Sequence, residues 1–151
     1  MTLNDKKPFQ TIIFWRGSKK DPLPDSSPSL QYDVMINNIV CSGHKETFKA
    51  LNQLKQITAE FTDGVIIALV GRSNGLGPIL AAHTIWPIIA VPTTLKEFPD
   101  DIWSSIRLPS KVPLLTTWPV ENAILAAKNI LAINNPALRQ KRSQEIASLE
   151  E

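Results

Sequence analysis

The chain has 151 residues, of which 43% are hydrophobic and 20% charged, a balance that suits one globular domain with a single core. Its 16 basic and 14 acidic residues give a net charge of +2, which gives no reason to expect nucleic acid or a membrane surface as a partner. The one cysteine, Cys41, excludes an internal disulfide and is typical of a reducing cytosol. We therefore expect a single cytoplasmic domain over residues 1–151.

The first strand is predicted at residues 11–15 (TIIFW), a β-branched and aromatic run. The segment after it excludes a long helix, because it contains three prolines that restrict the backbone. These are Pro22, Pro24 and Pro28. Residues 33–41 predict a second strand, which is less apolar and is therefore expected nearer an edge of the sheet.

A helix is predicted over residues 45–60, with Ser42 standing where an N-cap is expected. Large apolar side chains recur at helical spacing along it and predict one buried face. They are Phe48, Leu51, Leu54, Ile57 and Phe61.

The rest of the chain continues the alternation of strands and helices. Residues 64–70 (GVIIALV) form a continuous apolar run, which is typical of a central parallel strand covered on both sides. A glycine-rich turn and a short helix over residues 79–83 follow. The remaining predicted elements are strands at 87–91 and 112–117 and helices at 98–106, 121–133 and 137–149, the last opened by Pro136.

This alternation predicts an α/β fold, a three-layer sandwich around a five-stranded parallel sheet of flavodoxin-like order 2-1-3-4-5, with an extra C-terminal helix. In such a sheet, ligands bind beyond the carboxyl ends of the strands. The first three strands end at residues 16–21 (RGSKKD, the first turn), 42–45 (SGHK, the second turn) and 71–75 (GRSNG, the third turn). We therefore expect these three turns to be neighbours in space.

Small residues, hydroxyls and an imidazole in these turns suit a phosphate-bearing small ligand, because glycines let backbone N–H groups approach an anion. Neither common nucleotide-binding motif is present, and a lone glycine-rich turn is also typical of a tight connection from strand to helix. The histidines, the cysteine and the carboxylates show no metal-ligand spacing. The residues alone thus leave the ligand open.

A stronger indication comes from the stretch VGRSNGLGPILAAHTIWPIIAVP, followed by DIWSSIRLPS, which resembles the AIR carboxylase family. It is most similar to the branch that uses carbon dioxide directly. CSGHK is similar to the family's SAHK or SAHR element, and RGSKKD to its GSxSD element. The resemblance implies carboxylation of 5-aminoimidazole ribonucleotide by carbon dioxide, giving the 4-carboxylate in de novo purine (IMP) biosynthesis. It further implies a homo-oligomer, an octamer, that needs no cofactor and no metal.

The same resemblance assigns roles in the three turns. His44 falls on the proton-transferring histidine, and Lys45 and Ser73 fall on the other catalytic positions, where carbon dioxide is held. The positions implied to bind substrate are Gly17, Ser18, Asp21, Ser42, Gly43, Arg72, Asn74 and Gly75.

Two alternatives to a carboxylase remain. One is a carboxyaminoimidazole ribonucleotide mutase, which the tail PALRQKRSQEI favours, although the histidine-containing third turn of the mutases (GAGGAAHLPG) is absent. The other is a divergent, non-catalytic protein that binds a nucleotide or assembles with a partner. It is favoured by Lys20 at a serine position of GSxSD, by Gly43 in place of alanine, and by the proline-rich crossover.

Overall fold

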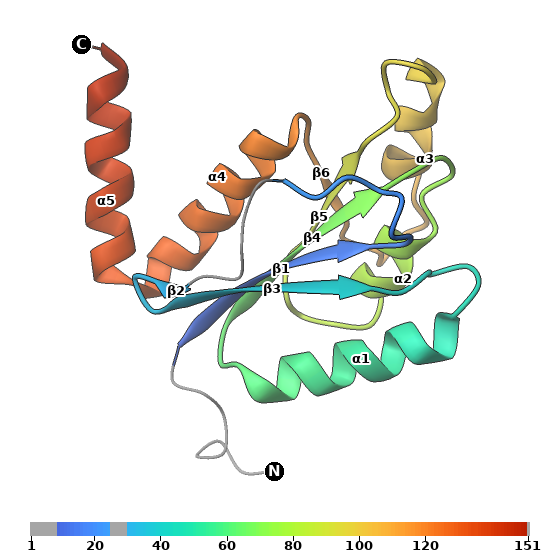
Figure 1. Ribbon diagram of the computed structural model, residues 1–151, viewed down its shortest axis with the longest axis horizontal. Coiled ribbons are helices and arrows are strands. Elements are labelled where there is room, and N and C mark those ends of the chain that lie inside the picture. Colours follow the sequence, from blue (N-terminus) through green and yellow to red (C-terminus); the bar gives the residue numbers. More distant parts are fainter. Residues whose placement is uncertain (1–8, 25–29, 151) are drawn as a thin grey trace.

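The computed structural model describes residues 9–24 and 30–150 of the chain. Among these residues one sheet is formed, in the strand order β2-β3-β1-β4-β5-β6 (Figure 1). Its strands are β1 (Gln10–Arg16), β2 (Leu30–Gln31), β3 (Val34–Val40), β4 (Gly64–Val70), β5 (Ile88–Pro92) and β6 (Leu115–Thr116). All neighbouring pairs are parallel except β2 with β3. The five parallel strands follow the order 2-1-3-4-5, so the predicted α/β fold is confirmed, and the short β2 is an addition at the edge.

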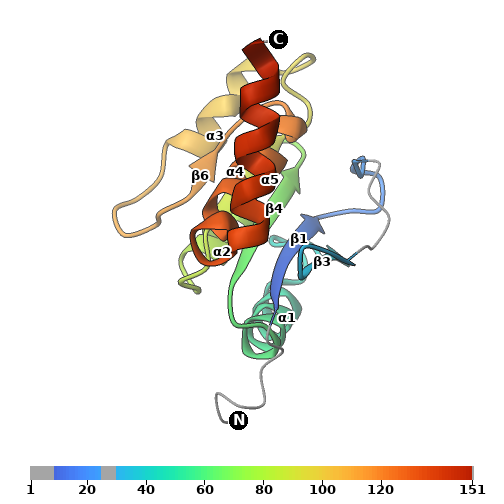
Figure 2. The ribbon, with the colours of Figure 1, turned by 90° about the vertical axis from the view of Figure 1, so that its left-hand side faces the viewer.

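Helices cover both faces of this sheet. They are α1 (Thr47–Glu60), α2 (Leu76–Ala81), α3 (Trp103–Ile106), α4 (Val120–Leu131) and α5 (Pro136–Ala147), with 3-10 turns η2 (Pro99–Ile102), η3 (Ala132–Asn134) and η4 (Ser148–Glu150). Figure 2 shows α1 on one side of the sheet and α4 with α5 on the other. No helix among the described residues has the length and apolar character needed to cross a membrane.

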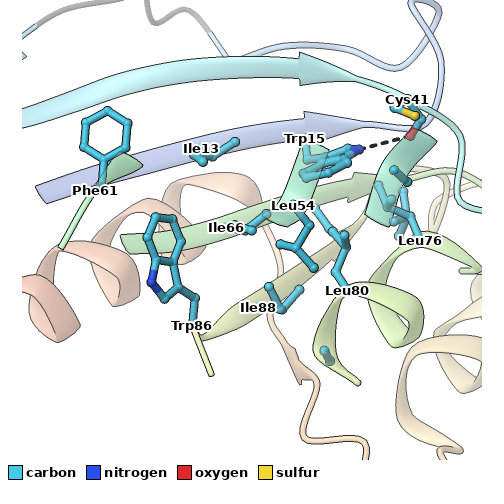
Figure 3. Close-up of a cluster of buried hydrophobic side chains, with 14 residues drawn as sticks. Ile13, Trp15, Cys41, Leu54, Phe61, Ile66, Leu76, Leu80, Trp86 and Ile88 are labelled. Atoms are coloured by element: carbon cyan, nitrogen blue, oxygen red, sulfur yellow. Dashed lines mark hydrogen bonds between the residues drawn. The ribbon is translucent and has the colours of Figure 1, made fainter. Parts of the chain in front are cut away.

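The core consists of two clusters separated by the sheet, because successive residues of a strand face opposite sides. Trp15 of β1 and Ile66 of β4 belong to the cluster beneath α1 and α2, which Figure 3 shows. Phe14 and Ile67, one position away on the same two strands, belong to the cluster beneath α4. All seven residues of β4 are buried, as expected for a central strand covered on both sides.

Two predictions about α1 are wrong. Its N-cap is Glu46 and not Ser42, because Ser42 Oγ instead accepts the backbone N–H of Lys45 at 3.1 Å, which closes a separate turn ahead of the helix. Phe48 is 85% exposed, whereas Leu54 and Phe61 are buried. The buried stripe of the helix also includes Ala50, whose side chain is too small to stand out in the sequence pattern.

The predicted fifth strand is reduced to the two residues of β6, within the predicted range of 112–117. Val112 and Leu114 nonetheless pack against the cluster beneath α2, which explains why this segment is apolar although most of it is not a strand. In the first crossover, the described residues 17–24 contain no helix, as the prolines predicted. Pro28 lies outside the described residues.

The register of the sheet brings the three turns together. Arg16, at the end of β1, pairs with Val40 at the end of β3 on one side and with Leu69 near the end of β4 on the other. The carboxyl ends of β3, β1 and β4 therefore lie side by side, and each leads directly into one of the three turns.

Candidate active site

The three turns line one cavity of ≈ 320 Å³ at the carboxyl end of the sheet. All eleven predicted site residues line it: Gly17, Ser18, Asp21, Ser42, Gly43, His44, Lys45, Arg72, Ser73, Asn74 and Gly75. A larger cavity of ≈ 380 Å³ lies between β3 and α5, but it contains none of these residues and is lined mainly by apolar groups and two lysines. The cavity at the turns is thus where the predicted chemistry is concentrated.

The first turn is held by contacts within itself. The carboxylate of Asp21 accepts the backbone N–H of Ser18 at 3.0 Å, and the guanidinium of Arg16 donates to the backbone carbonyl of Asp21 at 3.0 Å. The second oxygen of the Asp21 carboxylate lies beside Gly71, where an added Cβ would be 3.5 Å from it. Lys20 is exposed and donates its backbone N–H to Ser18 Oγ at 3.2 Å.

The second turn is packed against the third. A Cβ added at Gly43 would lie 2.7 Å from the Cα of Leu76, and a Cβ at Gly75 would overlap the imidazole of His44. The His44 ring thus lies directly on the backbone of Gly75. The side chains of His44 and Lys45 are exposed, and no hydrogen bond or ion pair of the Lys45 ammonium is found within the described residues.

Two titratable neighbours of the second turn are poorly suited to act as a base or nucleophile. Lys49 donates to the carboxylate of Glu46 at 3.0 Å and, by this hydrogen bond, lowers the pKa of Glu46. Burial of Cys41, and secondarily the charge of Glu46, raises the pKa of its thiol. Among the described groups near this turn, the imidazole of His44 is an exposed side chain that can both accept and donate a proton.

The third turn is held by a segment some thirty residues away in the sequence, residues 98–105. Ser73 has a positive φ of 57°, a left-handed conformation that costs on the order of 1–2 kcal/mol for a residue with a Cβ. Its backbone N–H donates to the carboxylate of Asp101 at 2.9 Å. The next N–H, of Asn74, donates to Ser104 Oγ at 3.1 Å.

Asn74 was predicted to contact substrate, but its side chain is committed within the protein. It is 7% exposed; its Nδ2 donates to Ser105 Oγ at 3.0 Å, and its Oδ1 accepts the N–H of Gly77 at 2.8 Å. The guanidinium of Arg72, in contrast, is exposed and stacks over the ring of Phe98 at 4.0 Å. The structure thus gives Asn74 the task of fixing the turn and leaves Arg72 at the rim of the cavity.

Sequence reasoning assigned no role to Asp101, Ser104 and Ser105. They belong to the stretch DIWSSIRLPS, whose resemblance to the family was the available signal, but nothing in the sequence indicated that its side chains accept hydrogen bonds from the third turn. Within the described residues, no group of three or more histidine, cysteine or acidic side chains is arranged to hold a metal ion.

Known proteins resemble this chain in both sequence and structure. Residues 27–151 match the family described as AIR carboxylase. The chain belongs to that family. It is 38% identical over 96 residues to the probable multifunctional protein ADE2 of Caenorhabditis elegans, covering 64% of this chain and 23% of that protein. It is also 38% identical over 103 residues to a phosphoribosylaminoimidazole carboxylase of Archaeoglobus fulgidus, covering 68% of this chain and 56% of that protein.

A further relative is an N5-carboxyaminoimidazole ribonucleotide mutase of Pyrococcus horikoshii, which is 27% identical and covers 93% of this chain and 82% of that protein. The crystal structure of Treponema denticola PurE superposes with a TM-score of 0.81 at 21% identity, covering 93% of this chain and 92% of that one. The structural likeness supports the fold. The relatives named as carboxylases are more similar in sequence than this mutase, which agrees with the predicted resemblance to the carboxylase branch.

Proposed function

We propose that the chain is a direct AIR carboxylase of purine biosynthesis, which joins carbon dioxide to C4 of 5-aminoimidazole ribonucleotide. The observation that carries the proposal is the placement of His44, Lys45 and Ser73 in one cavity together with Asp21. Similarity to the carboxylase of Archaeoglobus fulgidus and to the multifunctional animal proteins supports it.

The reaction needs no ATP, biotin or metal, because the aminoimidazole ring is electron-rich at the carbon beside its amino group. That carbon attacks carbon dioxide, a carbon–carbon bond forms, and negative charge develops on the two carboxylate oxygens. The Lys45 ammonium and the Ser73 hydroxyl are the groups in the cavity that stabilise this charge. The imidazole of His44 then takes the proton that the attacked carbon loses, which restores the aromatic ring.

The ribonucleotide itself is held by the first two turns in this proposal. The Asp21 carboxylate accepts a hydrogen bond from a ribose hydroxyl. Room for the phosphate is left by small residues, which are Gly17, Ser18, Ser42 and Gly43. Binding ring and gas together in one cavity also removes part of the entropic cost of the reaction. Arg72, at the rim, adds positive charge facing the anionic substrate.

The test is an assay of the purified protein with aminoimidazole ribonucleotide and bicarbonate, without ATP, in which the carboxylated product is followed by absorbance. Product formation that depends on dissolved carbon dioxide supports the proposal. The mutase is the second candidate, favoured by the Pyrococcus horikoshii relative that matches 93% of this chain. If the protein converts only the N-carboxylated ribonucleotide, the mutase replaces the carboxylase. If it binds nucleotide but converts neither, it is the non-catalytic alternative.

We also propose that the chain acts in the cytoplasm as a symmetric homo-oligomer, an octamer. Near the C-terminus, the side chains of Ile133, Ile146 and Leu149 are 68%, 52% and 82% exposed. Leu138 is the one buried residue of α5, which stands away from the sheet in Figure 1. Apolar side chains left in water favour burial against another subunit. Light scattering at micromolar concentration is expected to return a multiple of the chain mass, and a monomer mass contradicts the assembly.

A further inference from the structure

Three hydrogen bonds tie the third turn to residues 98–105. Asp101 accepts from the backbone of Ser73, Ser104 accepts from the backbone of Asn74, and Ser105 accepts from the Asn74 side chain. The sequence separations are 28, 30 and 31 residues, so the turn cannot take this form from its own sequence alone.

The bond from Asp101 is made at the strained position of the turn. Ser73 has a left-handed φ of 57°, which a residue with a Cβ adopts only when its surroundings impose it. The backbone N–H of Ser73 is directed at Asp101 Oδ1, whereas the other carboxylate oxygen of Asp101 is buried without a hydrogen bond in the described structure. The bond to the Ser73 N–H is therefore the hydrogen bond that the Asp101 carboxylate makes within the described structure, and it stabilises the left-handed turn.

These contacts also decide which groups of the turn remain for a ligand. The N–H groups of Ser73 and Asn74 are both occupied, so neither can stabilise a developing carboxylate. The hydroxyl of Ser73 stays on an exposed residue that lines the cavity. The direction of that hydroxyl depends on the backbone conformation at Ser73, and hence on the acceptor at residue 101.

We propose that Asp101 is a positioning residue, which fixes the left-handed conformation of Ser73 and thereby aims its hydroxyl at the carbon dioxide subsite. It acts through Ser73 and touches neither substrate nor carbon dioxide. This inference rests on the proposed carboxylase function, since the subsite is part of that proposal. A carboxylate is the natural choice here, because a charged acceptor makes a stronger bond to a backbone N–H than a neutral one.

The test compares Asp101→Ala with Asp101→Asn, using Asp100→Ala as the matched control. Asp100 is the adjacent, exposed carboxylate, and its side chain makes no hydrogen bond to the third turn within the described residues. Asp101→Ala removes the acceptor, and we expect the KM for carbon dioxide to rise by about 10-fold. The dissociation constant of the nucleotide and kcat at saturating carbon dioxide should change by less than about 3-fold.

The Asn variant retains an amide oxygen that can accept the same N–H, so it is expected to recover most of the wild-type KM. Asp100→Ala should behave as wild type. A wild-type KM in Asp101→Ala, an equal rise in Asp100→Ala, or a matching loss of nucleotide affinity overturns the proposal. If Asp101→Ala does not fold, Asp101→Leu replaces it, because it also removes the acceptor for the Ser73 N–H but retains a branched side chain of similar shape. A selective rise in the same KM supports the positioning role, and an unchanged KM overturns it.

A second readout separates this inference from the proposed function. Amide hydrogen exchange of residues 71–76 is expected to be faster by about 10-fold or more in Asp101→Ala than in Asp100→Ala, because the Ser73 N–H has lost its acceptor. If the wild type shows no carboxylation, the carboxylase proposal fails, and the exchange rates still decide whether Asp101 holds the turn. Unchanged exchange overturns the positioning role whatever the activity.

Discussion

The first and third turns follow neighbouring strands and line the same cavity, but they are held in different ways. The first turn is stabilised by bonds between residues three to five positions apart, such as those from Ser18 to Asp21 and from Arg16 to Asp21. The third turn is held by side chains about thirty residues away, and its Asn74 is almost completely buried. The first turn is therefore stabilised by contacts that are local in the sequence, and the third by contacts that depend on the tertiary structure.

This difference matches the chemistry proposed for each side. A developing carboxylate is stabilised best by groups already fixed before the reaction, because no reorganisation is then needed. Holding a ribose and a phosphate demands less precision, which agrees with Lys20 in the first turn and with the lack of a helix among the described residues 17–24. We therefore expect variants on the third-turn side to affect the use of carbon dioxide and the stability of the protein, and variants in the first turn to affect nucleotide binding.

The largest effect is expected where the second turn meets the third, at His44. If its imidazole takes the ring proton, His44→Asn should lower kcat by about 10²-fold or more, the usual scale for a positioned acid–base group. Nucleotide affinity should be nearly unchanged, because the site retains its shape and its other polar groups. Calorimetry beside steady-state rates measures both quantities.

The chain offers a matched control for this variant. Its one other histidine, His83, is exposed, and its Nδ1 lies 2.7 Å from the carbonyl of Ile79 at the end of α2. His83→Asn should leave kcat within about 2-fold, because surface substitutions away from a site have small effects. Equal turnover in wild type and His44→Asn would remove His44 from the mechanism.

A somewhat smaller effect is expected on stability when alanine replaces a glycine of the first turn or of the second turn, which packs against the third. At Gly43 the new Cβ would lie 2.7 Å from the Cα and 2.9 Å from the N of Leu76, and neither backbone atom can move without shifting α2. We expect Gly43→Ala to lower the free energy of unfolding by about 1–3 kcal/mol, the range for overpacking.

Gly17→Ala is the counterpart in the first turn. Its Cβ would meet nothing closer than Asp21 Oδ2 at 3.9 Å, and Gly17 does not have a positive φ. Its unfolding free energy should therefore stay within about 0.5 kcal/mol of the wild type. Urea denaturation of both variants measures the contrast, and equal losses would show that the two turns are packed alike.

The third prediction concerns binding by the first turn. Asp21→Asn removes the negative charge from the proposed acceptor of a ribose hydroxyl, and should raise the dissociation constant of the nucleotide by about 10-fold. Turnover at saturating nucleotide should fall by less than about 3-fold, since Asp21 does not take part in the chemical step. Asp100→Asn is the charge-matched control, and calorimetry is the measurement. A large loss of kcat with unchanged affinity would assign Asp21 to catalysis instead.

The course of the chain could be predicted because its strongest signals are simple ones. The fully apolar run 64–70 could be placed nowhere but in the centre of a sheet, and the prolines after β1 excluded a helix there. The two wrong predictions, at Ser42 and Phe48, both lie at the start of α1. A side-chain hydrogen bond closes a turn ahead of α1, so the helix begins at Thr47, and Phe48 then lies in its first, exposed turn, whereas Ala50 and Leu54 are buried.

The candidate site also contains a part that the sequence predicted and a part that it did not. Strand order alone brought together all eleven predicted site residues, because turns after neighbouring parallel strands must meet. The contribution of Asp101 could not be predicted, since it depends on which face of a short helical segment lies against the third turn. The local sequence of residues 71–75 does not specify that contact.

The smallest effect on activity is expected at Cys41, which directly precedes the second turn and is buried in the cluster beneath α1 and α2. The thiol is fully buried, and burial together with the nearby Glu46 carboxylate raises its pKa, so at any given pH less of it is thiolate than in an ordinary cysteine. Because the thiolate is the reactive form, alkylation by iodoacetamide at pH 8 should be at least about 10-fold slower in the native protein than in urea. Cys41→Ala should keep kcat within about 2-fold, because neither proposed half of the cavity uses the thiol, and its main cost should be a modest loss of packing. Mass spectrometry of the alkylated chain beside residual activity measures both. Rapid labelling of the native protein, accompanied by loss of turnover, would mean that the second turn opens to solvent and that its packing against Leu76 is looser than the contact at Gly43 indicates.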